Sequence, residues 1–209
     1  DGKEDTVSYS LDFQDTADQP KVTFTINGKD CTDVLDQNNI TIMGSYSQNY
    51  YLTDLDVRDH TVEIALPDTG DSDDPATYFF RYDGKKLQYL GLVPDLLSNS
   101  SCQAYGDGTI MADTRLNLLE TAYTRALYQI GKDASIALRP QAWYPILRYT
   151  GIGAQQHKHR ILQNVMLYTE NNLSAQTIEL TPADGSVIFP DTDNRNWVSV
   201  QADSGQSGY

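Results

Sequence analysis

Short runs in which polar and apolar residues alternate, each ending at turn-forming residues, constrain this chain more than any other feature. A period of two puts successive side chains on opposite faces of an extended chain and predicts half-buried β-strands. The run over residues 21–26 ends at Asn27-Gly28, a dipeptide typical of hairpin turns, and Asp83-Gly84 marks another turn. We therefore expect an antiparallel β-meander with strands over residues 21–26, 39–43, 50–53, 61–66, 76–82 and 86–92.

Residues 114–130 are ambiguous between helix and strand. Apolar residues recur at helical spacing from Leu116 to Ile130, and periodicity alone favours a helix. The sequence around Gly131-Lys132-Asp133, however, is typical of a hairpin turn that joins two strands. The residues themselves leave both interpretations open.

The last third of the chain differs in the length and spacing of its predicted strands. Pro140, Trp143 and Pro145 mark a boundary, and a polar loop over residues 151–159 follows it. Short strands at close spacing, with turn residues between them, predict a small β-barrel. The expected strands cover residues 160–168, 177–180, 186–189 and 197–200.

The charge of the chain is acidic and unevenly distributed. The formal net charge is −14, and residues 1–75 hold 17 acidic and only 4 basic side chains. Nucleic-acid binders need a basic face to displace counterions from phosphates, so we expect no nucleic-acid partner. No apolar run approaches the ~20 residues of a bilayer-spanning helix, so we expect no membrane span. Residues 1–20 hold few apolar side chains and are predicted to form a flexible leader.

Two cysteines, Cys31 and Cys102, stand 71 positions apart. A disulfide between them would close a long loop and, in the chain-entropy model, stabilise the fold by about 4 kcal/mol. Two buried thiols that do not meet are the alternative, and the sequence does not decide between the two. The cysteines are too few and too far apart for a structural zinc site.

Four acidic residues gather in one segment: Asp54, Asp56, Asp59 and Glu63. Ca²⁺ takes six to eight oxygen ligands, and alternating Asp residues on a tight loop bring several carboxylates together. This segment is therefore the leading metal-site candidate, with calcium as the ion. The alternative is that the Asp side chains accept backbone N–H hydrogen bonds and stabilise turns. The acidic residues within 68–74 predict a solvated loop, with a second cation site as the alternative.

The histidines are weaker candidates. His157 and His159 would share one face of a strand, but no cysteine or acidic residue lies nearby in the sequence to complete a zinc site. His60 stands beside the acidic segment, where we expect it to be an ion partner rather than a catalyst.

Catalytic motifs are absent from the sequence. It holds no Gly-x-Ser-x-Gly elbow, no His-Glu-x-x-His and no phosphate-binding loop. A pair of Asp residues at glycosidase distances stays open as an alternative. Aromatic residues gather over residues 46–51, 78–82 and 143–149, and exposed Tyr and Trp anchor sugar rings or peptides at low entropy cost. Binding is therefore expected rather than catalysis.

Residues 51–66, which include Asp54-Leu55-Asp56-Val57-Arg58-Asp59, and residues 77–87 resemble the acidic loop and strands of FG-GAP/VCBS-type propeller repeats. This resemblance implies a secreted or lipid-anchored protein of Gram-positive, clostridia-like bacteria, in which an extended strand pair follows the blade. It therefore favours strands over residues 114–139. Calcium loops of that family follow an Asp-x-Asp-x-Asp-Gly pattern, whereas this chain has Arg58 in place of the third acidic ligand and Asp59 in place of the glycine.

The carboxyl-terminal residues resemble a bacterial Src-homology-3-like domain. The likeness depends on Asp184-Gly185, the strand Trp197-Val198-Ser199-Val200, Ser204-Gly205 and Gly208-Tyr209. Bacterial domains of this kind often bind cell-wall peptide or glycan. The resemblance thus implies that Trp197 and Tyr209 contact such a ligand.

These observations combine into one expectation for the whole chain. We expect an all-β protein with a leader over residues 1–20, blade-like antiparallel sheets over residues 21–145 and a small Src-homology-3-like barrel over residues 146–209. Its expected function is that of a non-enzymatic extracellular or cell-surface-anchored module that binds cell-wall peptide or glycan, with calcium as the one cofactor considered. A polysaccharide hydrolase with an Asp pair and a structural spacer without a ligand are the alternatives.

Overall fold

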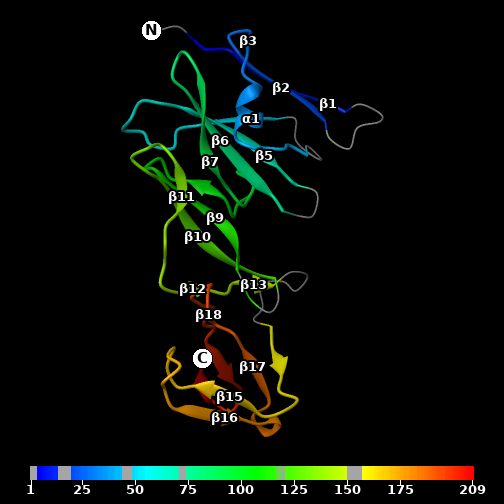
Figure 1. The fold of residues 1–209 in the computed structure, drawn as a ribbon, viewed down its shortest axis with the longest axis vertical. Helices are drawn as coiled ribbons and strands as arrows, with labels where there is room; N and C mark the ends of the chain where they lie inside the picture. The colour runs from blue at the N-terminus through cyan, green and yellow to red at the C-terminus, as the bar shows by residue number, and fades with distance from the viewer. Residues whose placement is uncertain are drawn as a thin grey trace. The chain divides into compact units, whose positions relative to one another are not determined.

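The structure, a computed structural model, describes residues 4–13, 20–43, 49–70, 74–116, 118, 121–149 and 157–209. Its regular structure is nearly all β, with several antiparallel sheets, so the all-β prediction is confirmed (Figure 1). Among the described residues, no helix has the length and apolar character needed to cross a membrane.

The chain forms two compact units. One unit holds residues 1–112 and 127–139, and the other holds residues 113–126 and 140–209. The chain therefore passes from one unit to the other within two strands, β9 (Thr109–Leu116) and β10 (Ala122–Ile130). The first of these units is called here the amino-terminal unit and the second the carboxyl-terminal unit.

A three-stranded sheet opens the amino-terminal unit. β1 (Val7–Asp12) pairs antiparallel with β2 (Lys21–Ile26) over its full length, and β3 (Lys29–Asp30) follows on the other side of β2. The predicted flexible leader thus contains a strand over residues 7–12, whereas residues 1–3 and 14–19 lie outside the described ranges. Polar and apolar residues alternate from Val7 to Asp12, but the sequence interpretation overlooked this signal because residues 1–20 hold few apolar side chains.

A four-stranded antiparallel meander forms the second sheet of this unit. Its strands follow one another in the order β4 (Tyr51–Thr53), β5 (Glu63–Asp68), β6 (Ala76–Tyr82) and β7 (Leu87–Val93). Four such strands are the number found in a propeller blade, and their positions match the predicted ones closely. The strand expected over residues 39–43 is not formed, although Ile40 and Ile42 are buried.

Aromatic side chains join these two sheets. Phe24 of β2 meets Phe80 of β6 edge to face, with ring centroids 5.7 Å apart, and Tyr9 of β1 packs on Phe24 at 6.1 Å. The short helix α1 (Asp33–Gln37) adds Val34 and Leu35 to the same buried cluster. The outer face of β1 is polar and exposed, which explains the alternation there, whereas β5 is buried on both faces.

A further sheet has the order β11–β10–β9–β8, with β8 (Gln103–Ala104) and β11 (Ile136–Leu138) at its edges and β13 (Arg148–Tyr149) also paired with β10. The strand interpretation of this region is thus confirmed and the helical one is wrong. In β10, residues 122, 124, 126 and 128 are buried, so its side chains alternate. The apolar residues from Leu116 to Ile130 also recur at helical spacing, and the pairing with neighbouring strands decides between the two.

The carboxyl-terminal unit consists of shorter strands. β12 (Tyr144–Pro145) pairs with β18 (Asp191–Thr192), and β15 (Val165–Tyr168) pairs with β16 (Thr177–Leu180). A four-stranded sheet has the order β14 (His159–Arg160), β17 (Ser186–Ile188), β19 (Val200–Ala202) and β20 (Ser207–Gly208), and the 3₁₀ turn η1 (Pro182–Asp184) precedes β17.

Buried Leu167, Leu180 and Val187 form the core of this unit together with Val200. Within the described residues these strands form separate sheets and do not close a barrel, which is the difference from the predicted architecture. Ladders of two to four residues are too short to continue around a closed surface.

The two cysteines do not form a disulfide. Both thiols are buried and no disulfide joins Cys31 to Cys102, which is the second of the two alternatives left open by the sequence. The amino-terminal unit, to which both belong, is therefore held by packing and hydrogen bonding without a covalent cross-link between these thiols.

Gly91 of β7 lies against Ile136 of β11, and a substitution at this glycine tests how the two strands pack. Its φ is +134°, and a Cβ at this position would lie 2.9 Å from the carbonyl oxygen and 3.0 Å from the Cβ of Ile136. We expect Gly91→Ala to lower the free energy of unfolding by about 3 kcal/mol, because backbone strain and overpacking both act. Urea denaturation measures this.

Gly84→Ala is the matched control for that substitution. Gly84 also has a positive φ, +86°, but a Cβ there would meet nothing within 4 Å. We expect a cost of about 1 kcal/mol, from the backbone conformation alone. Equal losses for the two variants would show that the contact with Ile136 does not matter.

Candidate functional site

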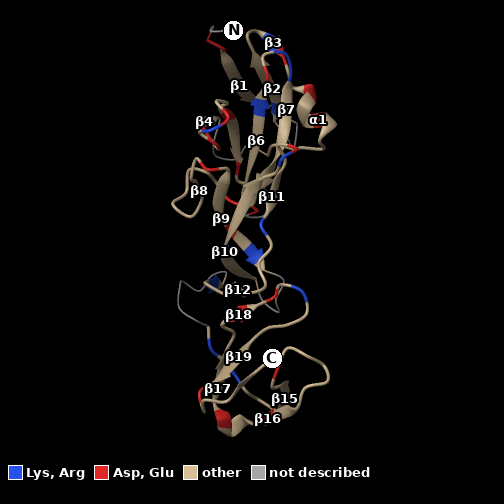
Figure 2. Cartoon of the chain, turned by 90° about the vertical axis from the view of Figure 1, so that its left-hand side faces the viewer, with Lys and Arg blue, Asp and Glu red and all other residues tan. Residues whose placement is uncertain are grey.

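Three of the four carboxylates of the predicted metal site, those of Asp56, Asp59 and Glu63, accept hydrogen bonds from arginine side chains. The guanidinium of Arg58 donates to both carboxylate oxygens of Asp56 at 2.6 Å, and it also donates to the carbonyl oxygen of Asp107 at 2.9 Å. Figure 2 shows this loop beside β4, where acidic and basic segments adjoin. Arg58 stands where the resemblance placed a third acidic ligand, and it binds the carboxylate that an ion would need.

Glu63 is the most deeply buried of the four acidic residues, with none of its surface exposed. It faces Arg81 across β5 and β6, and Arg81 donates to Oε1 of Glu63 from Nε at 2.9 Å and from Nη2 at 2.6 Å. The second oxygen, Oε2, accepts the backbone N–H of Leu55 at 2.9 Å. Arg81 also donates to Asp59 at 2.9 Å, so one guanidinium bridges two carboxylates.

Several Asp residues of the amino-terminal unit stabilise the same kind of turn. The carboxylate of Asp59 accepts the backbone N–H of Thr61 at 2.9 Å and its hydroxyl at 2.6 Å. Asp107 binds Thr109 in the same way, at 3.0 and 2.5 Å. These hydrogen bonds, above all those from the threonine hydroxyls, lower the pKa values of both carboxyl groups.

A third turn of this kind joins Asp133 to Ser135, with distances of 3.1 Å to the N–H and 2.7 Å to the hydroxyl. The shared Asp-x-Thr/Ser pattern is visible in the sequence, at residues 59–61, 107–109 and 133–135, and sequence reasoning overlooked it. Turn stabilisation was the stated alternative to metal binding, and the observed contacts of Asp59 follow it.

The described residues contain no group of three or more His, Cys, Asp or Glu side chains arranged to hold a metal ion. Asp54 lies exposed at the start of the acidic loop, and His60 is exposed beyond it with a positive φ of 61°. His157 and His159 do lie together, with ring centroids 4.5 Å apart, and His159 packs on Phe189 at 4.7 Å. Calcium binding therefore remains a prediction that the geometry does not support.

The two predicted ligand-binding residues belong to a row of aromatic side chains in the carboxyl-terminal unit. Tyr209 packs on Trp143, with ring centroids 5.6 Å apart, and Trp197 meets Tyr168 edge to face at 5.7 Å. Tyr168 and Tyr209 exchange both backbone hydrogen bonds, at 3.0 and 2.9 Å. Residues paired in this way point their side chains to the same face of an antiparallel pair.

The result is a continuous set of four residues, Trp143, Tyr209, Tyr168 and Trp197, here called the aromatic row. All four are half-buried, so each is packed on one side and open to solvent on the other. Sequence reasoning found Trp197 and Tyr209 but missed Tyr168, which lies 41 positions before Tyr209 in the chain. It placed Trp143 at a domain boundary rather than in a ligand site.

A tight turn fixes the position of Trp197. The carboxylate of Asp193 accepts the backbone N–H groups of Arg195, Asn196 and Trp197, each at 2.9 Å. Burial alone would raise the pKa of the Asp193 carboxyl, but these three hydrogen bonds outweigh burial and hold the pKa below its usual value. The Thr192 hydroxyl donates to the carbonyl oxygen of Trp197 at 2.6 Å, which closes the turn from the other side.

Comparison of the chain with protein-family models, with curated proteins and with solved structures found no match. The likenesses to propeller repeats and to a Src-homology-3-like domain therefore stay predictions from the residues that carry them. The candidate site is accordingly judged by its geometry.

The buried ion pair of Glu63 and Arg81 provides a stability test. We expect Arg81→Met to lower the free energy of unfolding by about 3 kcal/mol, because it leaves a fully buried carboxylate without its cation. Arg58→Ala is the matched control: its ion pair with Asp56 is equally short but its side chain is 71% exposed, so we expect a much smaller loss. If chemical denaturation showed similar losses of unfolding free energy for both variants, the burial of the Glu63–Arg81 ion pair would not be what makes it stabilising.

The Asp56 carboxyl provides a pH test. Its pKa is lowered from 3.8 to about 2, chiefly by the hydrogen bonds from Arg58. Because the folded state holds this proton less tightly than the unfolded state, the stabilisation is present above pH ~4 and is lost as the pH falls toward ~2. We expect Asp56→Asn to reduce the dependence of the free energy of unfolding on pH in that window, measured by urea denaturation. An unchanged dependence would contradict this assignment.

Proposed function

We propose that this protein is a binding module without catalytic activity and that the aromatic row contacts a cell-wall peptide or glycan. The observation that carries the proposal is the set of contacts that joins Trp143, Tyr209, Tyr168 and Trp197, each of which is partly exposed. Partly exposed aromatic rings with fixed positions bind ligands well, because little side-chain entropy is lost when the ligand arrives.

The chemistry of the row suits sugar rings and peptide side chains. The apolar faces of aromatic rings pack against the C–H groups of a ligand, while tyrosine hydroxyls and indole N–H groups supply hydrogen bonds at their edges. Exposed Arg195 and Asn196 lie beside Trp197 and add a positive charge and an amide. The ligand best fitted is therefore an uncharged or acidic polymer with both apolar and polar groups.

The acidic loop supports the non-enzymatic part of the proposal. A glycosidase needs two carboxylates that face a cleft about 5–10 Å apart. Asp56, Asp59 and Glu63 instead accept hydrogen bonds from arginine side chains and from turn residues. An extracellular or surface-anchored location follows from the resemblance described above and is part of the same proposal.

Retention on purified peptidoglycan tests this function. We expect the wild-type chain to be retained and Trp197→Ala to bind about tenfold more weakly, the loss typical of an aromatic anchor. Tyr105→Ala is the control: Tyr105 is 46% exposed, is an aromatic residue of the amino-terminal unit, and lies outside the aromatic row. Circular dichroism establishes that both variants are folded.

Two outcomes would reject the proposal. One is no retention of the wild-type chain, and the other is equal loss of binding for Trp197→Ala and Tyr105→Ala. Competition with soluble glycan fragments and with stem peptides then identifies which part of the polymer is bound.

A further inference from the structure

A pocket of about 290 Å³ in the amino-terminal unit has apolar walls from both of its first two sheets. Val7 and Ile26 are directly paired across β1 and β2, and Leu52 and Ile64 are directly paired across β4 and β5. Residues paired in this way project from the same face of their sheet, so each sheet presents two neighbouring apolar side chains. The volume is close to the lower limit of small-molecule sites, about 300 Å³, so the pocket suits a small ligand.

Two apolar side chains of this pocket are largely open to solvent. Leu52 is 61% exposed and Val62 is 53% exposed, whereas Ile26 and Ile64 are buried. Apolar surface gains about 25 cal/mol for each Å² that is removed from water. The rim of the pocket can therefore stabilise an apolar ligand that covers it.

The polar groups of the pocket are suited to accept hydrogen bonds. The carboxylate of Asp5 accepts the side-chain amide of Asn27 at 2.7 Å through Oδ1, which leaves Oδ2 available. The Thr61 hydroxyl already donates to Asp59 at 2.6 Å, so its lone pairs are what it can offer a ligand. Tyr82 adds an aromatic ring, which attracts cations. An ammonium group, with three donors and no acceptor, complements this set.

The charges around the pocket are negative. Its described lining includes Asp5 but no lysine or arginine, and Asp5 forms no ion pair with any described residue. The nearest guanidinium, that of Arg81, is shared by Asp59 and Glu63, so these three groups together carry one negative charge. A cationic ligand would therefore meet an uncompensated carboxylate.

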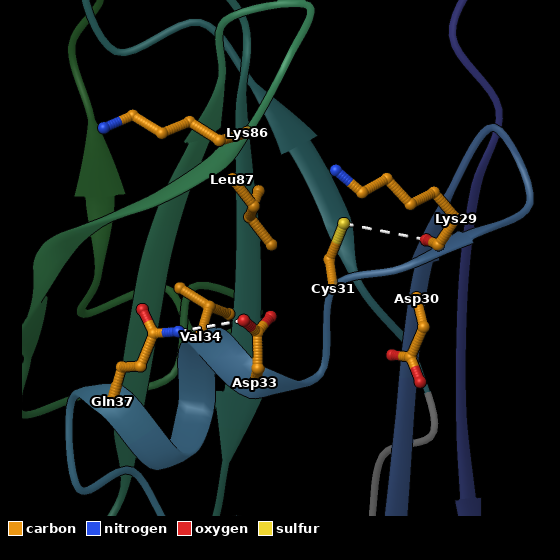
Figure 3. A pocket seen from close by; sticks show the side chains of 8 residues that line it. All are labelled: Lys29, Asp30, Cys31, Asp33, Val34, Gln37, Lys86 and Leu87. Atoms are coloured by element: carbon orange, nitrogen blue, oxygen red, sulfur yellow. Dashed lines mark hydrogen bonds between the residues drawn. The ribbon is translucent and has the colours of Figure 1, made fainter.

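A larger pocket of the same unit, here called the pocket at Cys31, has no such excess of one charge (Figure 3). It measures about 520 Å³ and lies between β3, α1 and the start of β7. Its two lysines, Lys29 and Lys86, are matched by Asp30 and Asp33, and the Lys86 ammonium points away from the pocket. The charges of its described lining cancel, so the smaller pocket is the stronger candidate for a charged ligand.

The geometry points to a binding site for a small organic ammonium compound with a compact apolar body. The body packs on Leu52 and Val62, and the ammonium group lies at the carboxylate of Asp5 and near the ring of Tyr82. This site goes beyond the proposed function, because it is separate from the aromatic row and takes a small molecule rather than a polymer.

Titration of the full chain with benzylammonium, followed by two-dimensional NMR, tests this inference. We expect saturable shifts at the pocket residues with a Kd of ~1–10 mM, as befits so small a ligand. Benzyl alcohol has the same body without the charge, and methylammonium has the charge without the body. Each is expected to bind at least about threefold more weakly, and benzoate, whose charge is reversed, more weakly still.

Substitutions test the two parts of the site separately. Asp5→Asn should raise the Kd for benzylammonium about threefold to fivefold, because it removes the charge but keeps the shape. Asp36→Asn is its control, an exposed carboxylate of the same unit outside the pocket, and should leave the Kd unchanged. Leu52→Ala should raise the Kd about twofold to threefold through lost apolar contact. Val57→Ala is its control, because Val57 is also 61% exposed but does not line the pocket.

Four results would overturn the inference. One is the absence of shifts at the pocket up to ~50 mM benzylammonium. Another is equal or tighter binding of benzyl alcohol or benzoate. The other two are equal effects of Asp5→Asn and Asp36→Asn, and equal effects of Leu52→Ala and Val57→Ala.

Discussion

The ion pair between Glu63 and Arg81 is the interaction on which the acidic part of the molecule depends. A fully buried carboxylate is costly unless its charge is neutralised and its oxygens accept hydrogen bonds, and Glu63 meets both conditions. The same guanidinium reaches Asp59, so the loop after β4 is fixed to the sheet beneath it. Arginine thus places positive charge beside the carboxylates of this acidic loop.

The acidic residues of the amino-terminal unit also have a structural use. Asp30, Asp59 and Asp83 each accept backbone N–H groups two or three positions further along the chain. Such bonds hold tight turns, and an ionised carboxylate strengthens them. Much of the negative charge is therefore distributed over turns between short strands.

The sequence predicted a feature of this structure well where the feature depends on neighbouring residues, and poorly where it depends on residues far apart in the chain. Alternation and turn dipeptides located β5, β6 and β7 within a few residues, because both signals are local. β1 carries the same alternation but was missed because the residues around it are polar. The aromatic row was half found: the Trp197 segment carries a recognisable pattern, whereas Tyr168 joins the row through a ring contact with Trp197 and a backbone pairing with Tyr209, both of which lie far along the chain from it. The pocket at Cys31 had no local signal, because its walls come from β3, α1 and β7.

The aromatic row has one more consequence. Trp143 and Trp197 are the two tryptophans of the sequence, and both belong to the carboxyl-terminal unit. Intrinsic fluorescence excited at the indole band consequently observes that unit alone, whereas tyrosine absorbance and backbone dichroism sample the entire polypeptide. Melting curves recorded with the two kinds of probe would coincide only if the halves unfold as one cooperative body.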